Sequence, residues 1–130
     1  MQSIAKLDLA IYRCVAPDLL TDEVIITAKQ VQHIFQGHPQ KEHAHVMQAL
    51  EATISQPDYV LADSHADHRM DTAIVMKRFP KEDGGYRVIL RLATSTDPAE
   101  QKNSVITASF ISEKKWNKYL RNKTVLYKRV

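Results

Sequence analysis

The sequence has few of the residues that cross-link a chain or carry it through a membrane. Its single cysteine, Cys14, excludes an internal disulfide and is typical of a reducing compartment. No apolar run approaches the roughly 20 residues that cross a bilayer. The initial segment, MQSIAKLDLAIYRCV, lacks the uninterrupted apolar stretch of a secretory signal. We therefore expect a cytoplasmic protein that does not bind a membrane.

Repeats and low-complexity segments are also missing. The 130 residues are 44% apolar and 25% charged, as in ordinary globular proteins. A chain of this length buries roughly two-thirds of its surface on folding. We expect residues 1–130 to form a single domain.

Acidic residues are missing from the end of the chain. No acidic residue follows Glu113. Residues 1–113 contain all 15 acidic residues of the protein and only 11 of its basic ones. Such asymmetry favours a polyanion-binding segment, although a solvated basic helix would look the same. We expect this segment to be an auxiliary contact; its basic residues are Lys114, Lys115, Lys118, Arg121, Lys123, Lys128 and Arg129.

Hydrophobic periodicity predicts helices first and an antiparallel sheet second, an α+β layout. Residues 4–15 fit a strand or a helix, and we favour the strand. A short strand at 24–26 precedes a helix capped by Thr27, and a second helix runs over 41–55. Asp83-Gly84 predicts a hairpin turn. The later elements expected are strands at 59–62, 73–79, 86–94 and 104–111, a short basic helix at 112–120 and a final strand at 124–127.

Two histidines lie near the end of the first long helix. His33 is inside it, and His38 follows Gly37, which breaks it. The break lets His38 fold back toward His33, and a helix C-terminus favours a protonated imidazole. A catalytic pair, metal ligands and plain surface residues all remain open for these two side chains.

Two arginines share one face of the predicted central strand at 86–94. Alternation puts Arg87 and Arg91 opposite the apolar positions, and an anionic ligand, a salt bridge or an exposed sheet face would each account for them there. The next strand offers Ser104 and Thr107. These two differ by three positions, so a regular strand would point them to opposite faces.

The segment from Asp63 to Asp71, DSHADHRMD, is a possible metal site, but its spacing matches no ligand signature. A polar loop explains its composition equally well. His43 and His45 are expected on the exposed side of the second helix. We expect no required metal and no cofactor.

Six stretches, in order and spacing, resemble the phage-associated members of the barnase–EndoU–colicin–RelE superfamily of nuclease domains. The resemblance covers about residues 22–129, and no single stretch is specific. The stretches are VIITAKQVQHIFQGHP, PDYVLAD, TAIVMKRF, YRVILRLATS, NSVITASFISEKKW and LRNKTVLYKR.

The resemblance implies N-terminal helices packed on a four-stranded, or slightly larger, antiparallel sheet. It implies that His33, His38 and Thr107 are catalytic. The implied substrate-binding residues are Arg91, Ser104, Tyr127 and Lys128. The phase of the predicted strand adds Arg87, on the same side as Arg91.

The implied activity is metal-independent cleavage of RNA by its 2′-OH, leaving a 2′,3′-cyclic phosphate. Histidine suits the proton transfers and arginine suits the phosphate. On this reading the protein is a phage or mobile-element toxin that cuts tRNA or another structured RNA, with an immunity or antitoxin protein as a possible partner. The competing hypothesis is a non-catalytic RNA- or protein-binding module of a phage particle or mobile element.

Overall fold

The fold is described from a computed structural model, which covers residues 3–63, 71–80 and 83–130. It contains a seven-stranded sheet with the order β1-β2-β6-β5-β4-β3-β7. All neighbouring strands are antiparallel except β2 and β6, which are parallel. The strands are β1 Ser3–Lys6, β2 Glu23–Ile25, β3 Tyr59–Ala62, β4 Asp71–Arg78, β5 Gly85–Leu92, β6 Asn103–Ile111 and β7 Val125–Lys128.

The predicted α+β class is confirmed, but the antiparallel sheet of four or slightly more strands differs from the observed seven-stranded sheet, which contains one parallel pair. Two helices and three strands separate β2 from β6 in the chain. This long connection allows β2 to pair with β6 in the parallel direction, beside the β5-β4-β3 part of the sheet. The N-terminal strand β1 then extends that edge, and β7 extends the other. The α-helices of the described residues are α1 Leu9–Tyr12, α2 Ala28–Phe35, α3 His43–Ser55 and α4 Glu113–Asn122.

The strand expected over residues 4–15 is also wrong beyond its first residues. Strand β1 ends at Lys6, and α1 begins at Leu9 with Asp8 as its cap; the Asp8 carboxylate accepts the Ala10 N–H at 3.0 Å. The Tyr12 hydroxyl, fully buried, donates to the Ile54 carbonyl at 2.7 Å. The helical stripe in this segment therefore docks on α3.

Helix α2 begins as predicted, because the Thr27 hydroxyl accepts the Gln30 N–H at 3.2 Å. It ends before Gly37, whose φ of 83° is a conformation that glycine adopts without strain. A 3-10 turn at Gln40–Glu42 leads into α3, which begins at His43, two residues later than predicted.

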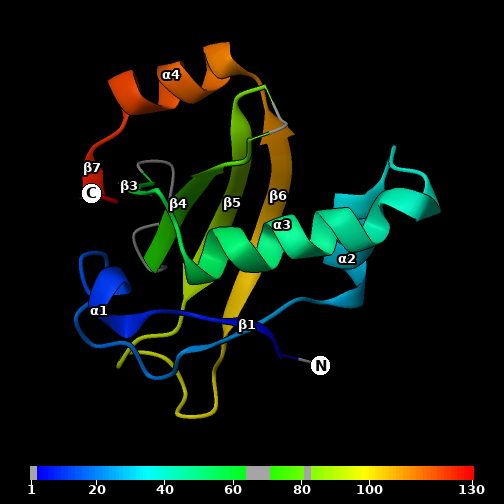
Figure 1. The fold of residues 1–130 in the computed structure, drawn as a ribbon. Coiled ribbons are helices and arrows are strands. Elements are labelled where there is room, and N and C mark those ends of the chain that lie inside the picture. The colour runs from blue at the N-terminus through cyan, green and yellow to red at the C-terminus, as the bar shows by residue number, and fades with distance from the viewer. Residues whose placement is uncertain (1–2, 64–70, 81–82) are drawn as a thin grey trace.

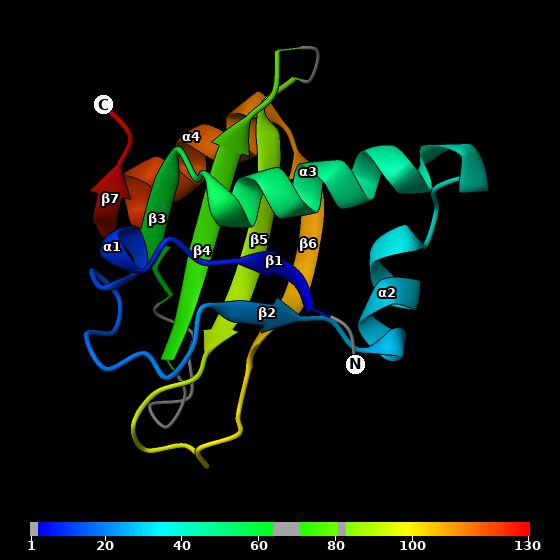
Figure 2. The ribbon, with the colours of Figure 1, turned by 60° about the horizontal axis from the view of Figure 1, so that its bottom comes forward.

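Helices cover the two faces of the sheet unequally. Helix α3 crosses in front of the strands in both ribbon views (Figures 1 and 2), and Figure 2 shows α4 behind them, on the other face. The larger core lies under α3 and includes Leu50, Val88 and Leu90. The smaller core, under α4, centres on Trp116 and Ile74. The two faces therefore differ in how much of them is sealed from solvent.

Candidate functional site

The phase of β5 places both arginines on the face that carries α4. Val88 and Leu90 are fully buried in the core under α3, whereas Arg87 and Arg91 are only half-buried. Ile89, which lies between the arginines, packs against the Trp116 cluster instead. The predicted sharing of one face by the two arginines is confirmed.

A β-bulge in β6 adds hydroxyl groups to the same face. Thr107 pairs with Ile89 and Val105 pairs with Leu90, so Ile106 is an extra residue between them. Because directly paired residues share a face, Ser104 joins Arg91, and Thr107 joins Ile89. A regular strand would point Ser104 and Thr107 to opposite faces, but the bulge makes β6 irregular and puts both on one face.

Arg91 has an anionic partner. Its Nη2 donates to the Asp97 carboxylate at 2.6 Å, and the other Asp97 oxygen accepts the Thr94 N–H at 2.9 Å. The Thr94 N–H and then the Arg91 guanidinium hold the pKa of Asp97 below its usual range. The salt bridge considered from the sequence is thus present at Arg91.

Arg87 has only neutral partners within the described part of the chain. Its Nη1 donates to the Tyr119 hydroxyl at 2.9 Å and its Nη2 to the Ser109 hydroxyl at 2.9 Å. Its Nε is buried and makes no hydrogen bond to any described residue. A half-buried guanidinium without a carboxylate is costly unless an anion binds there. Ser109 and Tyr119 were missed from the sequence because nothing local distinguishes them.

A cleft of about 430 Å³ opens between α4 and the sheet, next to Arg87. Ile74 of β4 and Ile89 of β5 form its apolar side, and Tyr119 of α4 joins them. The polar residues that line it are Asp63, Lys115, Lys118, Asn122 and Lys123. The sequence indicated basic character here, but it did not separate the lysines that line a cleft from those that do not.

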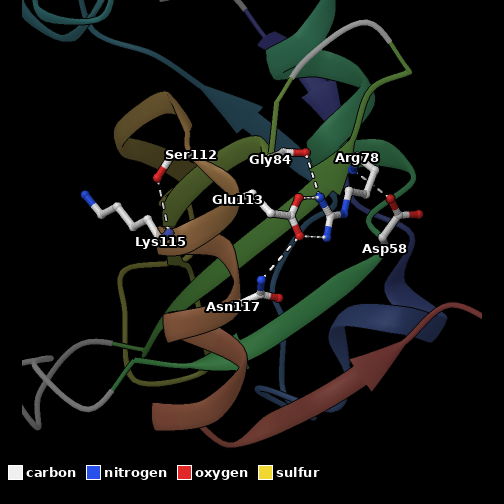
Figure 3. A network of polar contacts seen from close by, with 7 residues as sticks. All are labelled: Asp58, Arg78, Gly84, Ser112, Glu113, Lys115 and Asn117. Atoms are coloured by element: carbon white, nitrogen blue, oxygen red, sulfur yellow. Dashed lines mark hydrogen bonds and ion pairs between the residues drawn. The ribbon is translucent and has the colours of Figure 1, made fainter.

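Arg78, at the end of β4, anchors the beginning of α4 (Figure 3). The Arg78 guanidinium forms an ion pair with Glu113, with Nη2 and Oε2 2.9 Å apart, and Nη1 donates to the Gly84 carbonyl at 3.1 Å. The same guanidinium lies 4.2 Å from the centroid of the Trp116 ring. The backbone N–H of Arg78 donates to Asp58 at 2.8 Å.

Glycine and a capping serine complete this anchor. Gly84 has a φ of 72°, and a Cβ there would collide with the Ile111 carbonyl, so only glycine fits the predicted hairpin turn. The Ser112 hydroxyl caps α4 by accepting the Lys115 N–H at 3.2 Å, as predicted (Figure 3). The lysines of α4 are therefore held in a defined position over the sheet.

The two histidines of α2 lie apart from this anchor. His33 is exposed, while the core-facing Ile34 is buried. Gly37 turns the chain back, and the His38 N–H donates to the Phe35 carbonyl at 2.9 Å. The His38 ring lies 3.5 Å from the Glu42 carboxylate. No hydrogen bond or ion pair between described residues joins either histidine to the other or to the arginines.

Helix α2 nevertheless packs beside β6, the strand that carries Ser104 and Thr107. The histidine segment and the hydroxyl groups thus belong to neighbouring elements. The catalytic roles of His33, His38 and Thr107 stay predictions.

The histidines expected on the exposed side of α3 make ring contacts. His43 is half-buried and stacks on Phe35, with ring centroids 4.0 Å apart. His45 is exposed and stacks on Phe110 at 5.7 Å. His43 is therefore partly a packing residue, contrary to the expectation.

The two C-terminal candidates face opposite ways. Tyr127 pairs with Val60 and packs against the core under α3, so it does not share the face of the arginines. Lys128 pairs with Tyr59, whose ring belongs to the smaller cluster under α4. Lys128 is exposed. Only the lysine is on the side of the cleft.

The metal hypothesis rested mainly on residues 64–70, which lie outside the described residues. Elsewhere in the described chain, no three His, Cys, Asp or Glu residues are grouped so that they could hold a metal ion. Within the same residues, no helix is long and apolar enough to cross a membrane.

One face of the sheet combines half-buried arginines, hydroxyl groups and a lysine-lined cleft. This combination is typical of proteins that bind polyanions. The chain belongs to the family described as phage-Barnase-EndoU-ColicinE5/D-RelE like nuclease 2, whose model matches residues 5–128. The family predicted from the sequence is confirmed. Neither the curated proteins nor the solved structures include a match.

Proposed function

We propose that this nuclease-family member is an endoribonuclease that acts by 2′-OH transesterification without a required metal. The observation that carries the proposal is Arg87, a half-buried cation whose described partners, Tyr119 and Ser109, are both neutral. An RNA phosphate would supply the missing negative charge, and a guanidinium can hold it with two parallel hydrogen bonds.

The proposed reaction needs two proton transfers and a cationic site. The 2′-oxygen forms a bond to phosphorus while the bond from phosphorus to the 5′-oxygen breaks, leaving a 2′,3′-cyclic phosphate. A base takes the 2′-OH proton, and an acid protonates the leaving 5′-oxygen. We assign these transfers to His33 and His38. Arg87 and Arg91 stabilise the charge on the phosphoryl oxygens, with Ser104 and Thr107 as hydroxyl donors.

The packing of α2 beside β6 supports this assignment by proximity alone. The histidine segment adjoins the strand that carries both hydroxyl groups, but Ile34 of α2 packs into the core under α3, on the opposite face of the sheet. Structured RNA such as tRNA is the proposed substrate class. Lys128 extends the cationic surface on the side of the cleft. For a phage or mobile-element toxin, an immunity or antitoxin protein is the proposed partner.

The test is His33→Ala, with Gln32→Ala as the matched control because Gln32 is an exposed neighbour on the same helix. We expect His33→Ala to lower the cleavage rate by about a hundredfold or more. Wild-type activity should follow a bell-shaped pH profile and persist in a chelator. An RNA with a single 2′-deoxyribose at the cleavage position should stay intact there. Unchanged cleavage by His33→Ala would overturn the catalytic role of this residue.

A non-catalytic RNA- or protein-binding module is the second candidate. The observation in its favour is that no described hydrogen bond or ion pair links the two histidines to the arginine face. Tight RNA binding with no cleavage over the pH range would support it and overturn the enzyme proposal.

A further inference from the structure

We propose that the cleft between α4 and the sheet is a nucleotide subsite, which seats one base on its apolar side and the flanking phosphates on its lysines. This inference rests on the proposed RNA substrate and adds where the substrate is held. The cleft volume of about 430 Å³ lies within the range of roughly 300–1,000 Å³ typical of small-molecule sites.

The apolar side of the cleft suits a planar ring. Ile74 comes from β4 and Ile89 from β5, and the two pair directly across the sheet. Tyr119 contributes an aromatic ring from α4. Stacking of a base on an aromatic side chain is favourable and tolerates any base, because every base has a π-face. A bare phosphate would leave this surface unused.

The charged residues around the cleft match the two ends of a nucleotide. Lys115 and Lys118 supply cations for phosphate from one side of α4. Asp63 adds a carboxylate, which accepts the Thr72 hydroxyl at 3.1 Å and so has a defined orientation. A base presents N–H donors and a phosphate presents acceptors, so a lining with both signs of charge fits a nucleotide better than it fits a simple anion.

Tyr119 connects the cleft with the arginine face. It lines the cleft, and its hydroxyl accepts from Arg87 Nη1 at 2.9 Å. A base seated against Tyr119 therefore has an adjoining phosphate within the neighbourhood of Arg87. The cleft is then the subsite for a base next to the phosphate that Arg87 binds.

Helix α4 offers a charge-matched control. Lys114 and Arg121 are exposed on the same helix, but neither belongs to the described residues that line the cleft. The double variant Lys115→Gln/Lys118→Gln removes two charges from the cleft. Lys114→Gln/Arg121→Gln removes two charges from the rest of α4. A simple electrostatic attraction to the helix would weaken equally in both.

The experiment titrates each protein with the four nucleoside 3′-monophosphates and with inorganic phosphate, followed by NMR. We expect the monophosphates to shift the Tyr119 and Ile89 resonances. The cleft variant should bind them about tenfold more weakly, whereas the control variant, which keeps every described cleft residue, should lose much less. Thermal melting of each variant checks that it is folded.

Three results would overturn the subsite: inorganic phosphate binding as tightly as the nucleotides, equal weakening in the two double variants, or no shift at Tyr119 and Ile89. These outcomes are separable from failure of the proposed function. Nucleotide binding by a wild type that cuts no RNA would support the subsite and overturn the endoribonuclease. RNA cleavage without nucleotide binding in the cleft would overturn the subsite alone.

Discussion

The two faces of the sheet are built from the same strands but do different things. Under α3, the strands contribute fully buried aliphatic side chains such as Val75, Val88 and Leu90. Under α4, the Trp116 cluster covers only part of the face, and arginine and hydroxyl side chains occupy positions beside it. One face is closed by packing, and the other keeps polar groups within reach of a ligand.

Strand β5 shows why both properties can coexist. Side chains alternate along a strand, so Val88 and Leu90 can stabilise one face while Arg87 and Arg91 remain available on the other. Polar side chains on the α4 face therefore do not interrupt the packing of the core under α3. When apolar and polar side chains occupy opposite faces of a sheet in this way, a rigid scaffold can hold a site that is itself unfavourable for stability.

The largest expected effect on stability is a cavity under α3. Leu50 is 0% exposed, and Leu50→Ala should lower the free energy of unfolding by about 2–5 kcal/mol. Urea unfolding followed by circular dichroism measures it. Leu20→Ala is the control, since Leu20 is 39% exposed and should change stability by less than about 0.5 kcal/mol. Equal losses in both variants would contradict the closed core.

The second prediction concerns the open face. Arg87→Ala should lower RNA cleavage by about a hundredfold, as loss of a donor to a charged transition state does. Arg87→Lys should recover only part of the rate, because an ammonium group lacks the planar fork of a guanidinium. Single-turnover cleavage measures both rates.

The free energy of unfolding should not fall in Arg87→Ala, because the variant removes a charge that has no described anionic partner. Arg13→Ala, an exposed arginine after α1, is the control and should cut RNA like the wild type. Destabilisation of Arg87→Ala without a change in single-turnover rate would make Arg87 a structural residue.

The smallest effect is the pH dependence of the α4 anchor. Hydrogen bonding from Arg78 holds the pKa of Glu113 below its usual value of 4.5. A carboxyl whose pKa is lower in the folded chain contributes stability that is complete above the unfolded pKa and is lost as pH falls through the folded pKa. Glu113→Gln lacks this contribution at every pH.

We therefore expect the stability difference between the wild type and Glu113→Gln to be largest near neutral pH and to vanish in acid. Urea midpoints of both proteins between pH 7 and acid measure the difference. A difference that persisted below the folded pKa would mean that the ion pair with Arg78 is not its cause. Using the difference cancels the other carboxyls with lowered pKa, Asp18, Glu23 and Asp97.

Local patterns in the sequence were sufficient for several parts of the fold. The alternation in β5, the Thr27 cap of α2, the Gly84 turn and the basic helix α4 were all predicted, because each depends on residues a few positions apart. The same reasoning placed Arg87 and Arg91 on one face. Family membership also followed from the order of short stretches along the chain.

Other features depended on partners far away in the sequence. The strand expected over residues 4–15 became β1 and α1 because Tyr12 is buried against α3, where its hydroxyl bonds to Ile54. The bulge at Ile106 follows from pairing with β5, and it alone puts Ser104 and Thr107 on one face. No local pattern in the sequence predicted the extra residue in this strand.

The sequence by itself therefore determined the main element types from β2 onward, the charge asymmetry and the phase of the arginines, since periodicity and capping act over one or two turns of chain. Only the tertiary structure decided that Arg87 meets Tyr119 and Ser109, residues 32 and 22 positions away. It also decided which lysines of α4 line the cleft. Those contacts depend on how α4 is anchored over the sheet through Arg78 and Glu113, and that is a matter of packing between distant segments.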